Sequence, residues 1–443
     1  MALLNKSYNW KKILRVFGLI AVIMMFSAVS YVSVLGAPVE SENPEKYSDV
    51  KSAIESMYLL KQQYYKPISM SAMILNYIKS GSINGMLEML DDSDPYTGYM
   101  DVESFSEVQA SNDGVFGGVG VVIGNRNGKV TVINPIDGTP AMRAGLKSGD
   151  KIIKVDGIST EDAYVDYVST LLKGEPGTSV LVQVDRYGEI IEVEITREII
   201  QEQAARYYMF DKALGIGYIE LTTFSRKAGS DMQTALNDLM KQGMKALVLD
   251  LRYNGGGLVD QAVEIASMFI PSGPVVHVKP RNGDVTTFNT VSERLIDIPM
   301  VVLVNQYTAS ASEILSGALQ DTGVATVIGM PTFGKGLVQS LFTLSDGSGL
   351  AVTSQIYLTA GGREITHETP IVPDIQIEIE DITEEEYQAR IKKAQEDEAN
   401  GIRLTAEEMT KIDISLDTQM RTAIEVLTDE LLNNTTENFE NAA

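Results

Sequence analysis

The stretch from residue 215 to 329 alternates between short apolar runs and amphipathic segments, and this alternation limits the possible folds more than any other feature of the chain. Runs such as ALVLDL (246–251) and MVVLVN (300–305) read as buried strands. The segments between them space their apolar residues as helices do: 229–241, 259–269 and 312–319. Strands that alternate with helices are typical of a largely parallel sheet. The region is therefore predicted to have an α/β fold, and LVQSLFTL and GLAVTSQIYL, joined by SDGS, are predicted to follow it as a β-hairpin.

One predicted strand-to-helix junction carries a serine that is a candidate nucleophile. In YTASASEIL (307–315), Ser310 and Ser312 follow the apolar run, and Glu313 opens the predicted helix. The simplest interpretation is that both serines cap this helix. A catalytic interpretation requires a second residue that takes the proton of the serine hydroxyl.

A lysine in the next strand-loop unit is the candidate base. GMPTFGKGLVQ (329–339) holds Lys335 between two glycines in apolar surroundings. A lysine can act as a base when burial brings its pKa from about 10.4 toward 7. Gln339 is placed to orient the amine. The two histidines of the chain, His277 and His367, are weaker candidates, because no motif pairs either of them with an acid.

A glycine loop supplies candidate donors for an oxyanion. The segment ALVLDLRYNGGGL (246–258) ends a strand in an asparagine and three glycines at the start of a helix. Glycines let backbone N–H groups approach a ligand closely, so an amide of this loop and that of Ala311 are candidate oxyanion donors. A tight turn or a phosphate cradle are the alternatives. The phosphate cradle is disfavoured because no GK[ST] follows.

Together, YTASASEI, FGKGLVQ and LRYNGGGL resemble the motifs of the carboxyl-terminal processing (tail-specific) protease family, whose members use a Ser-Lys dyad. The resemblance covers roughly residues 45–430. It implies a crotonase-like α/β protease core in which Ser310 is the nucleophile, Lys335 the base and Gln339 the lysine-orienting amide. The same resemblance maps the oxyanion donors to Gly256 and Ala311. Thr308 and Pro370 depart from the family pattern, which has serine and glycine at these positions.

A glycine-punctuated module precedes the core. GGVGVVI and GTPAMRAGLKSGDKIIKVDG resemble the PDZ domain that is inserted in these proteases. A PDZ groove binds an extended peptide by strand addition and holds its terminal carboxylate on backbone amides, which map here to Gly118, Val119 and Gly120. Gly145-Leu146 and Gly149-Asp150 are interpreted as structural turns. The resemblance makes Arg186 a candidate for coupling the groove to the dyad. The argument against this role is that an arginine at the end of a strand is usually only solvated.

The ends of the chain predict its location. Lys6, Lys11, Lys12 and Arg15 precede an uncharged run, residues 16–36, that is about 31 Å long as a helix. This pattern predicts a retained signal anchor with the rest of the chain outside the cytoplasm, or a secreted protein if the segment is cleaved near residue 36. An apolar stripe in the last helix, at Ala423, Ile424, Leu427 and Leu431, suits either dimerisation or packing on its own domain. Homodimerisation is expected from the resemblance.

The predicted organisation is a signal anchor (1–37), a linker and helical region (38–112), a PDZ domain (113–197), a protease core (198–376) and a C-terminal helical region (377–443). The net charge of −24 disfavours nucleic acid as a partner, and the lack of cysteine excludes a thiol nucleophile. We expect no metal or cofactor. The predicted function is an extracytoplasmic serine endopeptidase that acts on proteins with free apolar C-termini. The alternatives are a PDZ scaffold on an inactive protease fold and a crotonase-like acyl-CoA enzyme.

Overall fold

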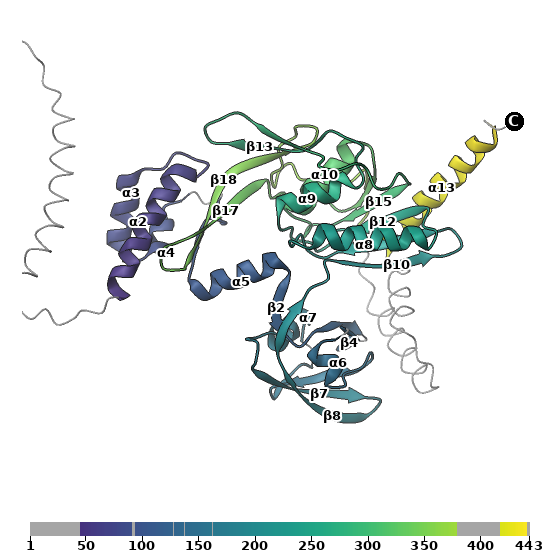
Figure 1. Cartoon of the computed structure of the whole chain (residues 1–443), viewed down its shortest axis with the longest axis horizontal. Coiled ribbons are helices and arrows are strands. Elements are labelled where there is room, and N and C mark those ends of the chain that lie inside the picture. The colour runs from purple at the N-terminus through teal and green to yellow at the C-terminus, as the bar shows by residue number, and fades with distance from the viewer. Residues whose placement is uncertain are drawn as a thin grey trace, which may run out of the picture.

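The computed structural model describes residues 45–90, 94–126, 128–136, 138–161, 163–378 and 417–440. The predicted signal anchor (1–37) and most of the predicted C-terminal helical region, up to residue 416, lie outside this part of the chain. Within the described ranges, none of the helices has the length and apolar character needed to cross a bilayer. Figure 1 shows N-terminal helices at one end, a central α/β core and a β-rich module beneath it.

The core is built on a six-stranded sheet with the order β10-β11-β12-β15-β16-β19. Only β10 runs antiparallel to its neighbour, and the other pairs are parallel. The central strands β12 (Ala246–Asp250) and β15 (Met300–Val304) are buried along their whole length, as expected for strands covered on both faces. The other strands are β10 (Ala205–Asp211), β11 (Ile216–Leu221), β16 (Thr326–Gly329) and β19 (Ile375–Gln376).

Helices cover both faces of this sheet, which confirms the predicted α/β class. The main apolar core forms on one face, beneath α8 (Ala228–Lys241), α9 (Val259–Ser267) and α10 (Ala311–Asp321). The helix α13 (Thr418–Glu440) covers the opposite face. Its Ala423 and Leu427 are fully buried against β11, β12, β15 and β16, and Ile424 and Leu431 are partly buried there. The stripe proposed for dimerisation therefore packs on its own sheet.

A second sheet centres on the long strand β18 (Gly349–Thr359), which pairs with β17 (Leu337–Thr343) in the predicted hairpin. The sheet also holds β1 (Gly98–Met100), β13 (Pro274–Pro280) and β14 (Thr286–Asn289). The N-terminal helices α2 (Glu45–Gln63), α3 (Met70–Ser80) and α4 (Ile83–Leu87) share an apolar cluster with Leu350 and Val352 of β18. This packing brings the segment after α4 to the same sheet as the loop that carries Lys335.

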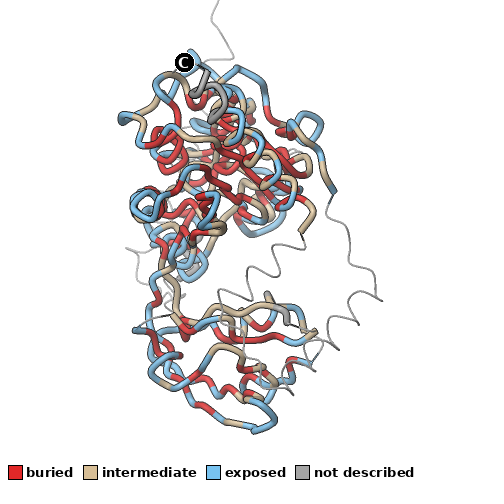
Figure 2. Tube along the Cα trace, turned by 90° about the vertical axis from the view of Figure 1, so that its right-hand side faces the viewer, coloured by how far each residue is buried: buried red, intermediate tan, exposed pale blue. Residues whose placement is uncertain are grey.

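The β-rich module is connected to the core by the helix α5 (Val102–Asp113) and by an antiparallel strand pair, β2 (Val115–Gly118) and β9 (Glu198–Gln201). The module has its own buried core, visible as a separate group of buried residues below the main body in Figure 2. Its elements are β3 (Val121–Arg126), β4 (Lys129–Pro135), α6 (Pro140–Arg143), β5 (Lys151–Val155), β6 (Ile158–Ser159), α7 (Val165–Leu172), β7 (Ser179–Arg186) and β8 (Glu189–Thr196).

Candidate functional site

The predicted catalytic residues follow three parallel strands at the edge of the sheet where those strands end. Gly256 lies in the loop after β12, Ser310 and Ala311 follow β15, and Lys335 follows β16. The carboxyl ends of parallel strands are where open α/β sheets usually place ligands. The topology therefore gathers residues that are up to 79 positions apart in the sequence onto one edge.

Ser310 occupies a strained turn immediately before α10. Its backbone has φ 58° and ψ −117°, a region that residues other than glycine rarely adopt and that often marks functional sites. Ser312 lies inside the helix, and its hydroxyl donates to the Asn254 carbonyl at 2.9 Å. The interpretation of Ser312 as a helix cap is therefore wrong, because this hydroxyl ties the helix to the glycine loop.

Glu313 joins the two segments that carry the predicted dyad. Its side chain is fully buried, and its Oε2 accepts hydrogen bonds from the Ser310 amide at 2.9 Å and the Lys335 amide at 2.8 Å. Two donors bound to one oxygen lie within about 6 Å of each other, so the backbones of Ser310 and Lys335 are neighbours. Oε1 accepts from the Gly334 amide at 2.7 Å and the Thr332 hydroxyl at 2.6 Å.

Burial raises the pKa of the Glu313 carboxyl, and its four hydrogen bonds oppose that shift. All four partners donate to Glu313, so the clamp requires the ionised carboxylate. From its sequence context, Glu313 was predicted only to open a helix. Its signal was present in the spacing Ser310-x-x-Glu313, which matches a capping box, but the partners at 332–335 come from another strand-loop unit.

The amine of Lys335 is partly buried beneath the N-terminal region. Its Nζ lies 4.3 Å from the centroid of the Tyr96 ring. Desolvation lowers the pKa of Lys335, while the charges of Glu313 and Asp94 oppose this shift. Asp94 is buried and accepts from the Thr97 and Thr353 hydroxyls at 2.7 and 2.8 Å. Neither Asp94 nor Tyr96 was among the site residues predicted from the sequence.

Tyr357, from β18, contacts both the loop that carries Ser310 and the loop that carries Lys335. Its hydroxyl donates to the carbonyl of Lys335 and also interacts with the Ser310 side chain. Burial is the main reason why the pKa of Tyr357 is raised well above its ordinary value, so this residue is a neutral hydrogen-bonding group. Tyr357 is a further site residue that sequence analysis did not identify.

Among the described residues, no hydrogen bond joins Gln339 to Lys335. Its amide lies 3.4 Å from the Leu337 carbonyl and 3.5 Å from the Thr353 hydroxyl. Lys335 precedes β17, whereas Gln339 follows a register shift within that strand, so residues four apart do not face each other as they would on a helix. The predicted orienting contact is therefore not formed, and Gln339 reaches the surroundings of Lys335 only through Thr353 and Asp94.

The glycine loop packs directly against the nucleophile. A methyl group on Gly256, whose φ is 100°, would come within 2.8 Å of the Ser310 Cβ and the Ala311 nitrogen, so only glycine fits there. The Ala311 amide belongs to the first turn of α10 and has no intrahelical acceptor. In contrast, the Gly256 amide donates to the Asn254 Oδ1 at 2.9 Å. An oxyanion bound by Gly256 would therefore compete with Asn254.

Neither histidine is placed as the base. His277 lies on β13, where its ring contacts the Thr287 hydroxyl and the Ala360 carbonyl. His367 contacts the segment that carries Lys335, since its Nδ1 lies 2.7 Å from the Phe333 carbonyl. Within the described ranges, no group of three or more histidine, aspartate or glutamate side chains is arranged to hold a metal ion.

The β-rich module has a small groove between β3 and α7. It encloses about 40 Å³ and is lined by Phe116, Gly118, Val119, Gly120, Val121, Ile123, Ser169, Leu172 and Lys173. The amides of Val119 and Gly120 make no hydrogen bond within the described structure. The ammonium of Lys173 lies 5.1 Å from the centroid of the Phe116 ring. A groove lined by a cationic side chain and by amides without acceptors favours a carboxylate ligand.

Arg186 makes its contacts inside the module. Its guanidinium binds both oxygens of the buried Asp150 at 2.7 Å and donates to the Gly145 carbonyl. The glycines at 145 and 149 have positive φ, as expected for structural turns. Arg186 is therefore neither simply solvated nor directed toward the dyad, because this ion pair occupies its side chain.

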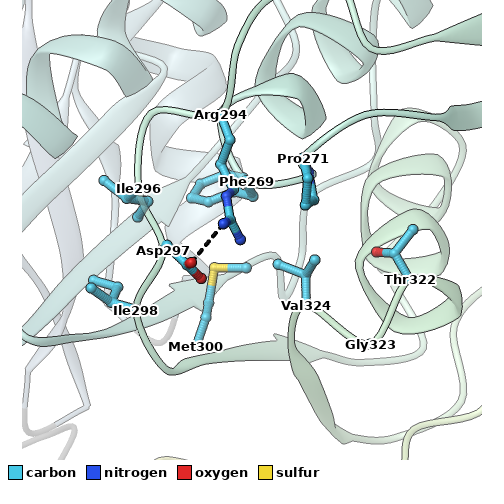
Figure 3. Close-up of a pocket in the computed structure, with 10 residues that line it drawn as sticks. All are labelled: Phe269, Pro271, Arg294, Ile296, Asp297, Ile298, Met300, Thr322, Gly323 and Val324. Carbon is cyan, nitrogen blue, oxygen red and sulfur yellow. Dashed lines mark hydrogen bonds and ion pairs between the residues drawn. The ribbon is translucent and has the colours of Figure 1, made fainter.

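A separate cavity of about 280 Å³ lies at the other edge of the core sheet. Its lining includes Met300, the first residue of β15, whereas Ser310 follows the last residue of that strand. Figure 3 shows Arg294 and Asp297 paired within it at 2.5 Å. This cavity lies away from the predicted catalytic residues.

Comparison with known proteins gives consistent results. Residues 215–377 match the model of peptidase family S41, and residues 117–196 match that of the PDZ domain. The chain is 34% identical over 357 residues to the carboxy-terminal processing protease CtpA of Bacillus subtilis, which covers 80% of this chain and 74% of the relative. It is 38% identical over 333 residues to the carboxyl-terminal-processing protease of a Picosynechococcus species, which covers 72% of this chain and 79% of that protein. A putative S41 protease from Bacteroides fragilis has a similar fold, with a TM-score of 0.53 at 16% identity over 79% of this chain and 98% of that one.

Proposed function

Because the chain belongs to the carboxy-terminal processing serine proteases of family S41, we propose that it cleaves proteins outside the cytoplasm with a Ser310–Lys335 dyad. We further propose that its PDZ domain selects substrates by their C-termini. The observation that carries the dyad is the Glu313 carboxylate, which accepts hydrogen bonds from both the Ser310 and the Lys335 amides. Partial burial of Lys335, which lowers the pKa of its amine, supports its role as a base.

In the proposed reaction, the Ser310 hydroxyl attacks the scissile carbonyl while the neutral Lys335 amine takes the hydroxyl proton. The resulting oxyanion accepts hydrogen bonds from the Ala311 amide and from the Gly256 amide. The Gly256 N–H then either donates to both the oxyanion and the Asn254 Oδ1 or exchanges Asn254 for the oxyanion. The Lys335 ammonium then gives its proton to the leaving amine as the peptide bond breaks. A water molecule, deprotonated by the same lysine, hydrolyses the acyl-enzyme and regenerates Ser310.

The PDZ groove supports recognition of a free C-terminus. Open amides at Val119 and Gly120 and the cation of Lys173 suit the terminal carboxylate. The apolar residues of the groove, among them Val121, Ile123 and Leu172, suit an apolar last side chain. Substrates of the proposed enzyme are therefore proteins that end in an apolar residue.

Two further parts of the proposal concern location and assembly. The uncharged run at 16–36 supports a single-pass anchor with the catalytic part outside the cytoplasm. Homodimerisation is supported by exposed apolar side chains on α2 and α3, at Val50, Ile54, Tyr58, Ile74, Leu75 and Ile78. Large apolar side chains that are exposed on neighbouring helices are typical of a protein interface. Sedimentation of the purified protein and of an Ile54→Glu/Ile78→Glu variant tests this assembly, because a dimer held by these side chains would dissociate in the variant.

The dyad is tested with full-length protein and an unfolded substrate that carries an apolar C-terminus. Ser310→Ala and Lys335→Met are each expected to lower kcat at least about 10³-fold. Only Ser310→Ala should also remove covalent labelling by a fluorophosphonate outright. Cleavage by Lys335→Met at the rate of the unsubstituted protein would overturn the dyad, and labelling of a residue other than Ser310 would overturn the nucleophile. Binding of the substrate without cleavage by any form would favour the PDZ scaffold.

A further inference from the structure

Two tyrosines stand beside the catalytic loops with their rings stacked in the open. The ring centroids of Tyr253 and Tyr307 are 5.5 Å apart, and the ring planes differ by 19°. The two residues are 66% and 56% exposed. Tyr253 lies three residues before Gly256, and Tyr307 lies three residues before Ser310. Since three residues span at most about 11 Å, the pair borders the reacting groups.

One buried side chain holds both tyrosine backbones. The Oδ1 of Asn305, which is fully buried, accepts from the Tyr253 amide and from the Tyr307 amide, each at 3.1 Å. The pair is therefore fixed in place before any ligand arrives. Preorganised contacts lose less conformational entropy when a ligand binds.

The backbone of Tyr253 has a conformation that is costly for a tyrosine. Among the described residues, those other than glycine with positive φ are Asp156, Tyr187, Tyr253 and Ser310. Asp156 and Tyr187 each precede a glycine of positive φ in a tight turn between paired strands, which accounts for them. Tyr253, at φ 62°, precedes Asn254 instead. Asparagine or glycine would adopt this conformation at lower cost, and the exposed ring gains little from burial.

A third exposed aromatic residue, Phe333, adds to the apolar surface beside the catalytic loops. Phe333, two residues before Lys335, is 38% exposed and stacks edge-on against His367. Its amide donates to the carbonyl of Thr308, next to Tyr307, at 3.0 Å. Exposed aromatic rings from three loops thus flank the nucleophile and the base. Rigid aromatic side chains give large contact area at low entropic cost and are enriched at binding surfaces.

We propose that the Tyr253–Tyr307 pair is a platform for a substrate side chain. It selects an aromatic or large aliphatic residue close to the scissile bond, and this selection is separate from recognition of the C-terminus by the PDZ domain. An extended peptide advances about 3.3 Å per residue, so the selected residue lies within about three positions of the cleaved bond. This inference rests on the proposed function of the Ser310–Lys335 site and specifies its substrate.

The experiment uses full-length protein and unfolded substrates that share one C-terminus. A single Phe, Ala or Arg is moved through the three positions on each side of the cleaved bond, and kcat/KM is measured. The variants are Tyr253→Asn, which suits the positive φ, and Tyr307→Ala. Tyr187→Asn is the matched control, because it makes the same change at an exposed tyrosine of positive φ in the PDZ domain. Fluorophosphonate labelling of Ser310 reports whether the dyad is intact.

We expect kcat/KM of the unsubstituted protein to favour Phe over Ala about tenfold at one position. Tyr253→Asn and Tyr307→Ala should each bring this ratio close to one without slowing labelling, and Tyr187→Asn should keep it. Equal losses on Phe and Ala substrates, or an unchanged ratio, would overturn the platform. A preference for Arg that the variants lose would overturn the apolar assignment. An unsubstituted protein that neither labels nor cleaves would instead refute the proposed function, and with it this inference.

Discussion

Two loops of this molecule present backbone amides next to glycines, yet the protein holds them in opposite ways. In the core, the Gly256 amide is bound to Asn254, and the neighbouring nucleophile is tied to the lysine segment by the buried Glu313. In the PDZ domain, the Val119 and Gly120 amides make no hydrogen bond among the described residues, and both residues line a groove of about 40 Å³.

The difference follows from what each loop has to do. A site that stabilises developing charge needs groups that are fixed before the reaction, and in the core a network of buried hydrogen bonds fixes the loops that carry them. A site that binds and releases a carboxylate needs open donors and a shallow surface. Changes in the core network should therefore affect both stability and catalysis, whereas changes in the groove should affect substrate choice.

The largest effect is expected from Glu313→Ala. This change leaves three backbone N–H groups and one hydroxyl, all buried or partly buried, without their acceptor. The free energy of unfolding should fall by about 3–5 kcal/mol, and kcat should fall at least about 100-fold because Ser310 and Lys335 lose their common anchor. Urea denaturation and fluorophosphonate labelling measure the two effects.

Glu293→Ala, at an exposed position of the core, is the control for the Glu313 variant. It should leave both quantities unchanged. If Glu313→Ala kept full labelling and stability, neither stability nor catalysis would depend on the core network. The contrast drawn between the two loops would then be wrong.

A smaller effect, confined to substrate choice, is expected from Lys173→Glu. Replacing this cation of the groove with an anion should weaken kcat/KM about tenfold for a substrate with a free C-terminus. The same substrate with an amidated C-terminus should be cleaved equally by both forms, and Lys154→Glu, on β5 of the same domain, controls for net charge. Equal losses on both substrates would mean that Lys173 does not contact the carboxylate.

The pH dependence tests the surroundings of Lys335. Its amine acts as a base only when deprotonated, so kcat/KM should rise with pH through a pKa below the ordinary range of lysine, as desolvation dictates. Asp94 favours the charged amine, so Asp94→Asn removes a contribution that raises the pKa of Lys335. The rising limb of the Asp94→Asn profile should therefore move to lower pH. A move to higher pH, or none, would show that Asp94 does not act on the base.

The smallest effect on cleavage is expected from Arg186→Met. Because Arg186 is bound to Asp150 inside the PDZ domain, this change should lower the stability of that domain by about 1.5–3 kcal/mol. Below the unfolding temperature of the domain, kcat/KM should stay within about twofold. A larger loss with the domain still folded, as judged by circular dichroism, would restore the coupling role suggested by the sequence.

The sequence predicted the parts of the molecule that depend on local pattern. The alternation between residues 215 and 329 gave the α/β core, because apolar periodicity reflects which face of an element is buried. The turn residues of SDGS gave the β17–β18 hairpin. The motifs around Ser310, Lys335 and Gly256 were found for the same reason, since each is one short stretch after a strand.

Only the tertiary structure decided which of these stretches lie next to each other and which side chains connect them. Glu313 reaches residues 332–335, and Asp94 and Tyr96 act on a lysine some 240 positions later, because helix and sheet packing brings distant segments together. The apolar stripe of α13 was visible in the sequence, but its partner, the sheet of its own core, was not. Periodicity shows that a face is buried and leaves open what covers it. That choice depends on long-range packing, which no single stretch of sequence contains.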